Sequence, residues 1–206
     1  MIRRGTLFLV AVLAASAVAF GPIPPPAQAG PQKLGRTVLV GGNAAHRRKY
    51  QRWIDAARTK VKQARAEVLF REANCPGAGG ELTACVIESR FFATKLRFYI
   101  PRELWTPRYY DPVDLQNTVL HELGHVYDFK YNADRHRGGW LQLFGLPPTA
   151  FYSADPKPPF ERFAVGYSYC AQGFNYERAL TRFEFDVYEH TFTREQYDAT
   201  CAMLKP

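Results

Sequence analysis

The chain has 206 residues and a formal net charge of +8, with 27 lysines and arginines against 19 acidic residues. This length suits one domain with a sizeable core, and we see no second domain. The basic residues gather between His46 and Arg71, which would suit an anionic cell envelope or an acidic substrate, or is simply a solvated helix face. We expect no nucleic-acid partner. We expect a monomer.

The first 29 residues have the order of a secretory signal peptide. Arg3 and Arg4 precede an uncharged apolar run, and a Pro-rich segment then ends in the small-x-small pattern Ala27-Gln28-Ala29. The run is shorter than the about 20 residues that a membrane helix needs, and an uncleaved anchor is the alternative. We therefore expect general export, cleavage after Ala29, and a secreted domain over residues 30–206.

Four cysteines follow this segment, an even number in a chain that we expect to leave the reducing cytosol. Disulfides are therefore expected, because the thiols of exported proteins become oxidised. Cys75 and Cys85 flank a Gly-rich turn, whereas Cys170 and Cys201 lie in two C-terminal segments. This arrangement favours pairing Cys75 with Cys85 and Cys170 with Cys201. No two of them have the short spacing of a zinc ribbon.

The first half of the domain contains four predicted strands and one predicted helix. Apolar and β-branched runs predict strands over residues 37–40, 67–70, 84–88 and 96–100. The last run alternates and ends at a proline, which is typical of an edge strand. Asn43 is expected to cap a helix. The residues predicted near its apolar face are Ala45, Trp53, Ile54, Ala57 and Val61.

The second half is predicted to be mainly helical. Residues 131–158 are rich in Gly, Pro and aromatics and predict a long loop. Further helices are expected over residues 160–171, stopped near Gly173, and over residues 194–203, with Thr193 opening a capping box. The elements together predict an α+β fold, with a small mixed sheet, an active-site helix and a mainly helical C-terminal part.

A helix expected from Asp111 to about Phe129 carries the sequence His-Glu-Leu-Gly-His. Its histidines, His121 and His125, are four residues apart, so they project from one face and can hold one metal ion. Glu122 lies between them, where it can accept a proton from a zinc-activated water and return it to the leaving amine. The motif predicts one catalytic zinc ion and peptide-bond hydrolysis, with a chance match on a surface helix as the alternative.

A catalytic zinc needs a third protein ligand. Tyr131 stands where the metzincin pattern has its third histidine, which excludes that family. His136 and Asp134 could reach the metal from the predicted loop, but no rigid element holds them. Glu161 is better placed in the first turn of the next predicted helix, where small Ala164 lets the two helices lie close. The alternative for this glutamate is an ordinary N-terminal acid favoured by the helix dipole.

The pairing of His-Glu-Leu-Gly-His-Val-Tyr-Asp with a downstream Glu-Arg-Phe-Ala resembles the zincin metallopeptidases whose third ligand is glutamate. Within them, the resemblance is closest to the catalytic domain of anthrax lethal factor and its small secreted relatives. It covers about residues 96–171 and is specific at the two motifs. The resemblance implies zinc bound by His121, His125 and Glu161, with Glu122 as the base.

In that family a tyrosine before the third ligand helps to hold the oxyanion, and Tyr152 is the matching residue here. Tyr152 lies farther from the glutamate than in the family pattern, so Tyr167 and His136 are alternative donors. Asp128 follows the second histidine by three residues. We expect its carboxylate either to accept a ring proton of a ligand histidine or to form a structural salt bridge.

These patterns predict a secreted zinc metalloendopeptidase that acts on peptides or proteins. The predicted edge strand over residues 96–100 would pair with a peptide substrate and fix its scissile bond over the metal. The alternatives are an inactive zincin-fold binding protein and an envelope protein with a structural zinc. Glu122 argues against both, because a structural site has no use for an acid beside an open metal position. His46 and His190 lack metal-like spacing and are expected to be surface or hydrogen-bonded histidines.

Overall fold

The computed structural model describes part of the chain, and all of these residues belong to one unit, Lys33–Pro206. The predicted signal peptide, residues 1–29, lies outside them. No helix in the described part is long and apolar enough to span a bilayer. The described stretches are residues 37–60, 67–77, 84–88, 96–102, 112–131, 135–152, 158–183 and 191–206.

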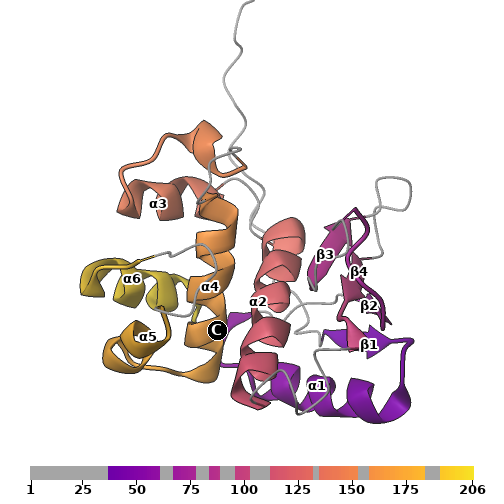
Figure 1. Ribbon diagram of the computed structural model, residues 1–206. Helices are drawn as coiled ribbons and strands as arrows, with labels where there is room; N and C mark the ends of the chain where they lie inside the picture. The colour runs from indigo at the N-terminus through magenta and orange to yellow at the C-terminus, as the bar shows by residue number, and fades with distance from the viewer. Residues whose placement is uncertain are drawn as a thin grey trace, which may run out of the picture. The chain divides into compact units, whose positions relative to one another are not determined.

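The described strands form a small mixed sheet (Figure 1), as predicted. They are β1 (Val38–Val40), β2 (Glu67–Arg71), β3 (Cys85–Glu88) and β4 (Leu96–Tyr99). The strand order is β1-β2-β4-β3, in which β1, β2 and β4 are parallel and β3 is antiparallel to β4. Val68, Phe70 and Phe98 point into the core, because successive side chains of a strand face opposite sides of the sheet.

The strand β4 lies inside the sheet, so the prediction of an edge strand over residues 96–100 is wrong. Leu96, Phe98 and Ile100 are fully buried, as expected for a strand with a neighbour on each side. Pro101 lies two residues beyond Tyr99, the last paired residue, and its missing N–H therefore removes no ladder hydrogen bond. Among the described strands, β3 occupies the edge next to β4.

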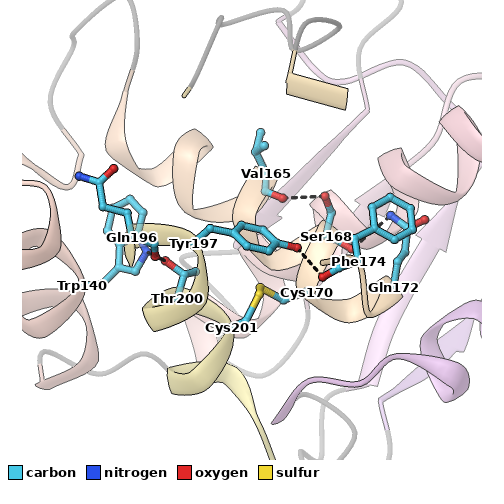
Figure 2. The surroundings of a disulfide bond; sticks show 10 residues. All are labelled: Trp140, Val165, Ser168, Cys170, Gln172, Phe174, Gln196, Tyr197, Thr200 and Cys201. Atoms are coloured by element: carbon cyan, nitrogen blue, oxygen red, sulfur yellow. Dashed lines mark hydrogen bonds between the residues drawn. A yellow bond between two sulfur atoms is a disulfide. The ribbon is translucent and has the colours of Figure 1, made fainter. Parts of the chain in front are cut away.

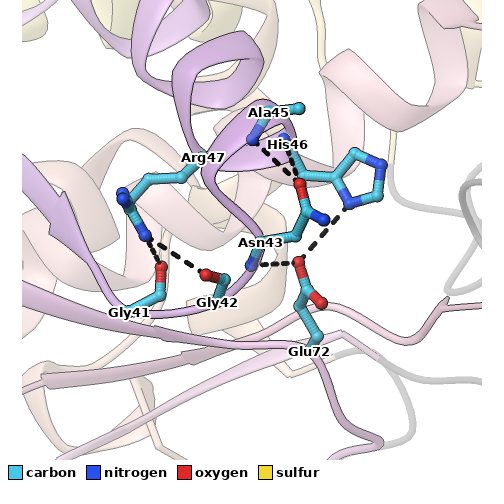
Figure 3. Close-up of polar contacts among 7 residues, drawn as sticks. All are labelled: Gly41, Gly42, Asn43, Ala45, His46, Arg47 and Glu72. Carbon is cyan, nitrogen blue, oxygen red and sulfur yellow. Dashed lines mark hydrogen bonds and ion pairs between the residues drawn. The ribbon is translucent and has the colours of Figure 1, made fainter.

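The turn between β1 and α1 (Ala44–Ala56) depends on two glycines (Figure 3). Gly41 and Gly42 have φ values of 89° and 59°, a left-handed region that strains other residues. A Cβ on Gly41 would also lie 2.7 Å from the carbonyl oxygen of Phe70. Asn43 then caps α1, as predicted, because its side chain accepts hydrogen bonds from two amides of the first turn.

Helix α1 packs against β1 and against the helix that carries the predicted metal ligands. The prediction of its apolar face was correct for Ile54 and Ala57, which are buried. It was wrong for Ala45, which is exposed because the first turn lies beyond the core, and it missed the fully buried Tyr50. Val61 lies outside the described residues.

The C-terminal half is mainly helical, as predicted, and α2 packs against α4 while α6 packs on α4 (Figure 1). The described helices here are α2 (Pro112–Tyr131), α3 (Arg135–Leu143), the 3-10 helix η3 (Pro148–Ala150), α4 (Pro159–Gln172), α5 (Tyr176–Phe183) and α6 (Arg194–Leu204). The long loop predicted over residues 131–158 is wrong, since α3 and η3 lie there. Trp140 and Leu141 of α3 are buried, and this burial outweighs the low helix propensity of the adjacent Gly138 and Gly139.

The C-terminus of α4 and the N-terminus of α6 have the predicted capping interactions. Gly173 closes α4 with a φ of 71°, and its N–H bonds to carbonyls of the last turn. The Thr193 side chain accepts from the Gln196 amide, and the Gln196 side chain accepts from the Thr193 amide, which completes the capping box. The helix α5 was not predicted, because eight residues form a stable helix only when tertiary packing supports them.

Both predicted disulfides are present. Cys75 joins Cys85 with Cα atoms 5.7 Å apart, and Cys170 joins Cys201 with Cα atoms 5.2 Å apart. The second bond ties α4 to α6 (Figure 2). Beside it, the Tyr197 hydroxyl of α6 donates a hydrogen bond to a carbonyl just after α4. Helix α4 is therefore held between α2 and α6.

Candidate metal centre

The middle of α2 carries the two predicted histidine ligands. Leu120 and Leu123 face the core, because they alternate with the histidines around the helix. His121 and His125 lie one turn apart, and their ring centroids are 5.0 Å from each other. Both side chains are largely buried but keep some exposure to solvent. Both rings can therefore be reached from solvent.

The start of α4 brings Glu161 to these histidines. Pro159 opens the helix, where its fixed φ fits and its missing N–H is not needed, so Glu161 stands in the first turn. Its Oε2 lies 2.9 Å from Nε2 of His121 and 3.4 Å from Nε2 of His125. Ligand atoms of the three residues lie within 4.8 Å of one another, close enough to hold one metal ion.

The histidines keep Glu161 ionised. Burial alone would raise the pKa of Glu161. Hydrogen bonds with His121 and His125, together with electrostatic attraction to these two residues, outweigh burial and hold this pKa well below its ordinary value. The carboxylate is therefore charged across the physiological pH range and ready to bind a cation.

Glu122 is buried beside these three residues, with 4% of its surface exposed. Burial raises the pKa of Glu122 to about 8. His121 lowers this pKa by electrostatic attraction, and Glu161 raises it by repulsion. A hydrogen bond from the Val86 backbone lowers it further. Among the described residues, Oε2 of Glu122 has no hydrogen-bond partner. A buried oxygen without a partner indicates that a cation, a water or a substrate group completes the site.

The donor set fits a divalent metal ion, and zinc in particular. Zinc binds imidazole nitrogen and carboxylate oxygen at about 2.0 to 2.2 Å, so two ligand atoms of a tetrahedral site lie about 3.3 Å apart. The distances from Glu161 Oε2 to the two histidine nitrogens, 2.9 and 3.4 Å, match this spacing. Magnesium and calcium prefer sets made of oxygen alone, which this group is not.

The close approach of α2 and α4 sets this geometry. A Cβ on Gly124 would lie only 3.0 Å from the Cα of Ala164, so the two small residues allow the backbones to meet, as predicted. Farther along the same contact, the Ser168 hydroxyl donates to the Asn117 side chain at 2.8 Å. These contacts fix the register that places Glu161 opposite the histidines.

Replacing Gly124 by alanine is expected to lower zinc affinity by about tenfold or more. The new methyl group would meet the Ala164 backbone, which cannot yield without moving α4 and the Glu161 that it carries. Alanine favours the helix by about 1 kcal/mol, but overpacking against Ala164 and Tyr167 costs about 1 to 3 kcal/mol, so the melting temperature should stay level or fall by a few degrees. Zinc titration against a chromophoric chelator measures the affinity, and circular dichroism measures the melting temperature.

Gly138→Ala provides a matched control. Gly138 lies in α3, and a Cβ there would meet nothing within 4 Å. The same substitution should therefore raise the melting temperature slightly and leave zinc affinity unchanged. If Gly124→Ala bound zinc as well as wild type, the spacing of α2 and α4 would not control the site.

A second polar group lies one turn after the ligand histidines. The Nε and Nη2 atoms of Arg137 donate to the two carboxylate oxygens of Asp128 at 2.8 and 3.0 Å. The Tyr152 hydroxyl donates to Oδ2 of Asp128 and accepts from Nη2 of Arg137. Of the two roles predicted for Asp128, the salt bridge is confirmed. The group joins the end of α2 to α3 and to the segment after η3.

These contacts bear on the predicted oxyanion role of Tyr152. Its hydroxyl is engaged by Asp128 and Arg137, while 51% of the residue is exposed. The Phe160 ring lies beside both groups, with centroids 5.8 Å from Tyr152 and 5.7 Å from His125. The oxyanion role of Tyr152 stays a prediction, and it requires the hydroxyl to leave Asp128.

Tyr167, the first alternative donor, is not brought to the centre. It is fully buried, and its hydroxyl accepts a hydrogen bond from Thr59 at 2.6 Å. Burial raises the pKa of Tyr167 far above its ordinary value, and the bond from Thr59 opposes this only in part. Its contacts are those of a core residue.

Of the other histidines and Asp134, the structure describes only some side chains. His136 belongs to α3, but its side chain lies outside the described residues, as do Asp134 and His190. His46 Nδ1 lies 3.4 Å from Oε1 of Glu72 (Figure 3), so the prediction of a satisfied histidine is confirmed for His46.

Sequence reasoning missed Arg137 and Phe160. Arg137 was assigned to a loop, and only the buried Asp128 before it indicated that a cation was needed nearby. Phe160 directly precedes Glu161 in the first turn of the predicted helix. Its position next to the predicted ligand Glu161 could have indicated that Phe160 lies near the metal centre.

No family model matches this chain, and no curated protein or solved structure matches it. What the centre can do follows from its own donors. Two imidazole nitrogens and one carboxylate can hold a metal ion, and a buried carboxyl group stands beside them.

Proposed function

We propose that this chain is a zinc-dependent metalloendopeptidase of the zincin type. His121, His125 and Glu161 would hold one zinc ion, and Glu122 would act as general base. The observation that carries the proposal is the convergence of these three donors beside a buried carboxyl group, one oxygen of which has no hydrogen-bond partner in the described part of the chain. A structural zinc site usually has four protein ligands and no such acid.

The chemistry divides between the ion and Glu122. A bound zinc ion supplies positive charge that makes water acidic near neutral pH and polarises a carbonyl group. Glu122 takes the proton of the attacking water and later gives it to the leaving nitrogen, which departs as an amine. Glu122 lies buried beside the three donors, so one carboxyl group can meet both the water and the leaving nitrogen.

The substrate would bind beside β3. This strand is the edge of the described sheet next to β4, packs against α2, and carries the Val86 backbone that hydrogen bonds with Glu122. An extended peptide that pairs with β3 would present its backbone along the metal centre. In this proposal residues 85–88, and not residues 96–100, would pair with the peptide substrate.

Secretion and a monomeric state belong to the same proposal. The two disulfides are compatible with an oxidising compartment, where such bonds persist. Cleavage after Ala29 would release the domain, and its partners would be peptides or unfolded proteins.

The test compares wild type with Glu122→Gln, which keeps the shape of the side chain and removes its acid–base function. Zinc content is expected to stay equal, while cleavage of an unfolded protein falls by about 10²- to 10⁴-fold. Glu177→Gln is the control, since Glu177 lies exposed on α5, and it should keep full activity. Equal cleavage by wild type and Glu122→Gln would refute the proposal. Zinc binding without any cleavage would favour the inactive binding protein.

A further inference from the structure

The outward side of α1 carries three neighbouring cations, Arg48, Lys49 and Arg52, here called the basic face. Helix α1, drawn in indigo beside β1 in Figure 1, turns its opposite side, with Tyr50 and Ile54, into the core. With 3.6 residues per turn, Arg48 and Arg52 lie one above the other on the solvent side. Both are exposed, and Lys49 is partly exposed.

Nothing in the described part of the chain neutralises these charges. Asp55 is the sole acidic residue of α1, and its carboxylate accepts a hydrogen bond from Gln51. No ion pair joins a cation of the basic face to a carboxylate among the described residues. Glu72, which follows β2, lies near the start of α1, where its carboxylate accepts a hydrogen bond from the Asn43 amide and lies against His46 (Figure 3).

The basic face opposes the stability of its own helix. Arg48 and Arg52 are like charges four residues apart, which repel each other. The first turn of α1 contains no acid, so no carboxylate there offsets this repulsion. Neighbouring Arg47 is used differently, because it donates to the carbonyls of Gly41 and Gly42 (Figure 3). The arrangement of the basic face is therefore better explained by a partner than by folding.

The arrangement of the three cations indicates what kind of anionic partner the basic face would bind. The cations stand side by side on a convex helix face, whereas a small anion is bound by donors that converge on it. Trp53 offers no free stacking surface for nucleic-acid bases, because it stacks on Tyr50 at 5.4 Å and lies under Lys49 at 5.1 Å. A broad anionic surface can meet all three charges at once.

We propose that the basic face adsorbs the protein onto anionic lipid membranes. Each exposed cation near such a surface raises the partition coefficient about fivefold, so three cations raise it about a hundredfold. Adsorption of this kind requires no apolar insertion and is weakened by salt. It would keep an exported protein at the envelope whatever its activity.

The experiment measures binding of the protein, secreted by its host and freed of the signal segment, to sedimented lipid vesicles. Wild type is compared with Arg48→Gln/Lys49→Gln/Arg52→Gln on vesicles of phosphatidylglycerol and phosphatidylcholine. The triple variant should partition about a hundredfold less, with an unchanged or higher melting temperature. Wild type should not bind phosphatidylcholine alone, and high salt should release it from the mixed vesicles.

The matched control, Arg102→Gln/Arg178→Gln/Lys205→Gln, removes three exposed cations that lie outside α1: one after β4, one in α5 and one after α6. It lowers the net charge equally and should keep most of the binding. An equal loss in both triple variants would overturn the proposal, because net charge alone would then explain adsorption. Binding to soluble polyglutamate but not to vesicles would overturn it in favour of an acidic polymer. None of these measurements depends on zinc or on proteolysis.

Discussion

Replacing Glu161 by alanine is expected to lower zinc affinity at least about tenfold. Glu161 is the only acidic member of the three-residue donor group, and its Oε2 lies within 3.4 Å of both histidine nitrogens. Without it, the metal keeps two neutral ligands from a single helix and loses the charge that offsets its own. Competition with a chromophoric chelator gives the dissociation constant, and metal analysis after dialysis gives the zinc content.

Glu177→Ala is the control for this experiment, since it removes a glutamate from the surface of α5 and should leave zinc binding unchanged. Unchanged affinity in Glu161→Ala would mean that the third ligand lies elsewhere. His136 and Asp134 would then be the residues to substitute next.

Replacing Arg137 by alanine is expected to lower the free energy of unfolding by about 3 kcal/mol. The Asp128 side chain is 2% exposed, and Arg137 contacts both of its oxygens, so the substitution leaves a buried charge without its counterion. For a domain of this size the melting temperature should fall by about 6 to 12 °C. Thermal and urea unfolding, followed by circular dichroism, measure the change.

A second substitution separates the charge from the packing of Arg137. Asp128→Asn, added to Arg137→Ala, removes the uncompensated charge and keeps an acceptor for the Tyr152 hydroxyl. The double variant should therefore be more stable than Arg137→Ala alone. A double variant that is less stable would show that Arg137 also acts through packing of its guanidinium group, which lies over the Phe151 and Tyr152 rings.

Features written into short stretches of sequence were predictable. The capping box at Thr193, the stop at Gly173 and the helix that carries His121 each depend on chemistry within a few residues. The disulfide pairing was also correct, because the cysteines fall into one pair around a tight turn and one pair of distant segments.

Features that depend on tertiary contacts were not predictable. The order of the strands follows from which strand pairs with which, and the alternation over residues 96–100 is equally compatible with an interior strand whose outer face is partly polar. The helix α3 was missed because its two glycines look like loop residues, and only the burial of Trp140 and Leu141 in the core stabilises it.

The candidate site was predictable in its ligands but not in its surroundings. Glu161 was found because it stands in the first turn of a recognisable helix, three residues before the small Ala164. The partner of Asp128 was not found, because Arg137 lies in the helix that was mistaken for a loop. For the same reason Tyr152 was assigned from family pattern alone, without sight of the salt bridge that engages it.

The ligands of the metal centre come from two helices, and His121 and Glu161 are 40 positions apart in the chain. A metal ion held between them therefore closes a loop of that length, much as a removable cross-link would. The unfolded chain cannot offer this site, so a bound zinc ion would favour the folded state and would shift the folding equilibrium by mass action. At a free zinc concentration about a hundred times the dissociation constant, this contributes about 2.7 kcal/mol. Zinc supply would then govern how long the folded protein survives.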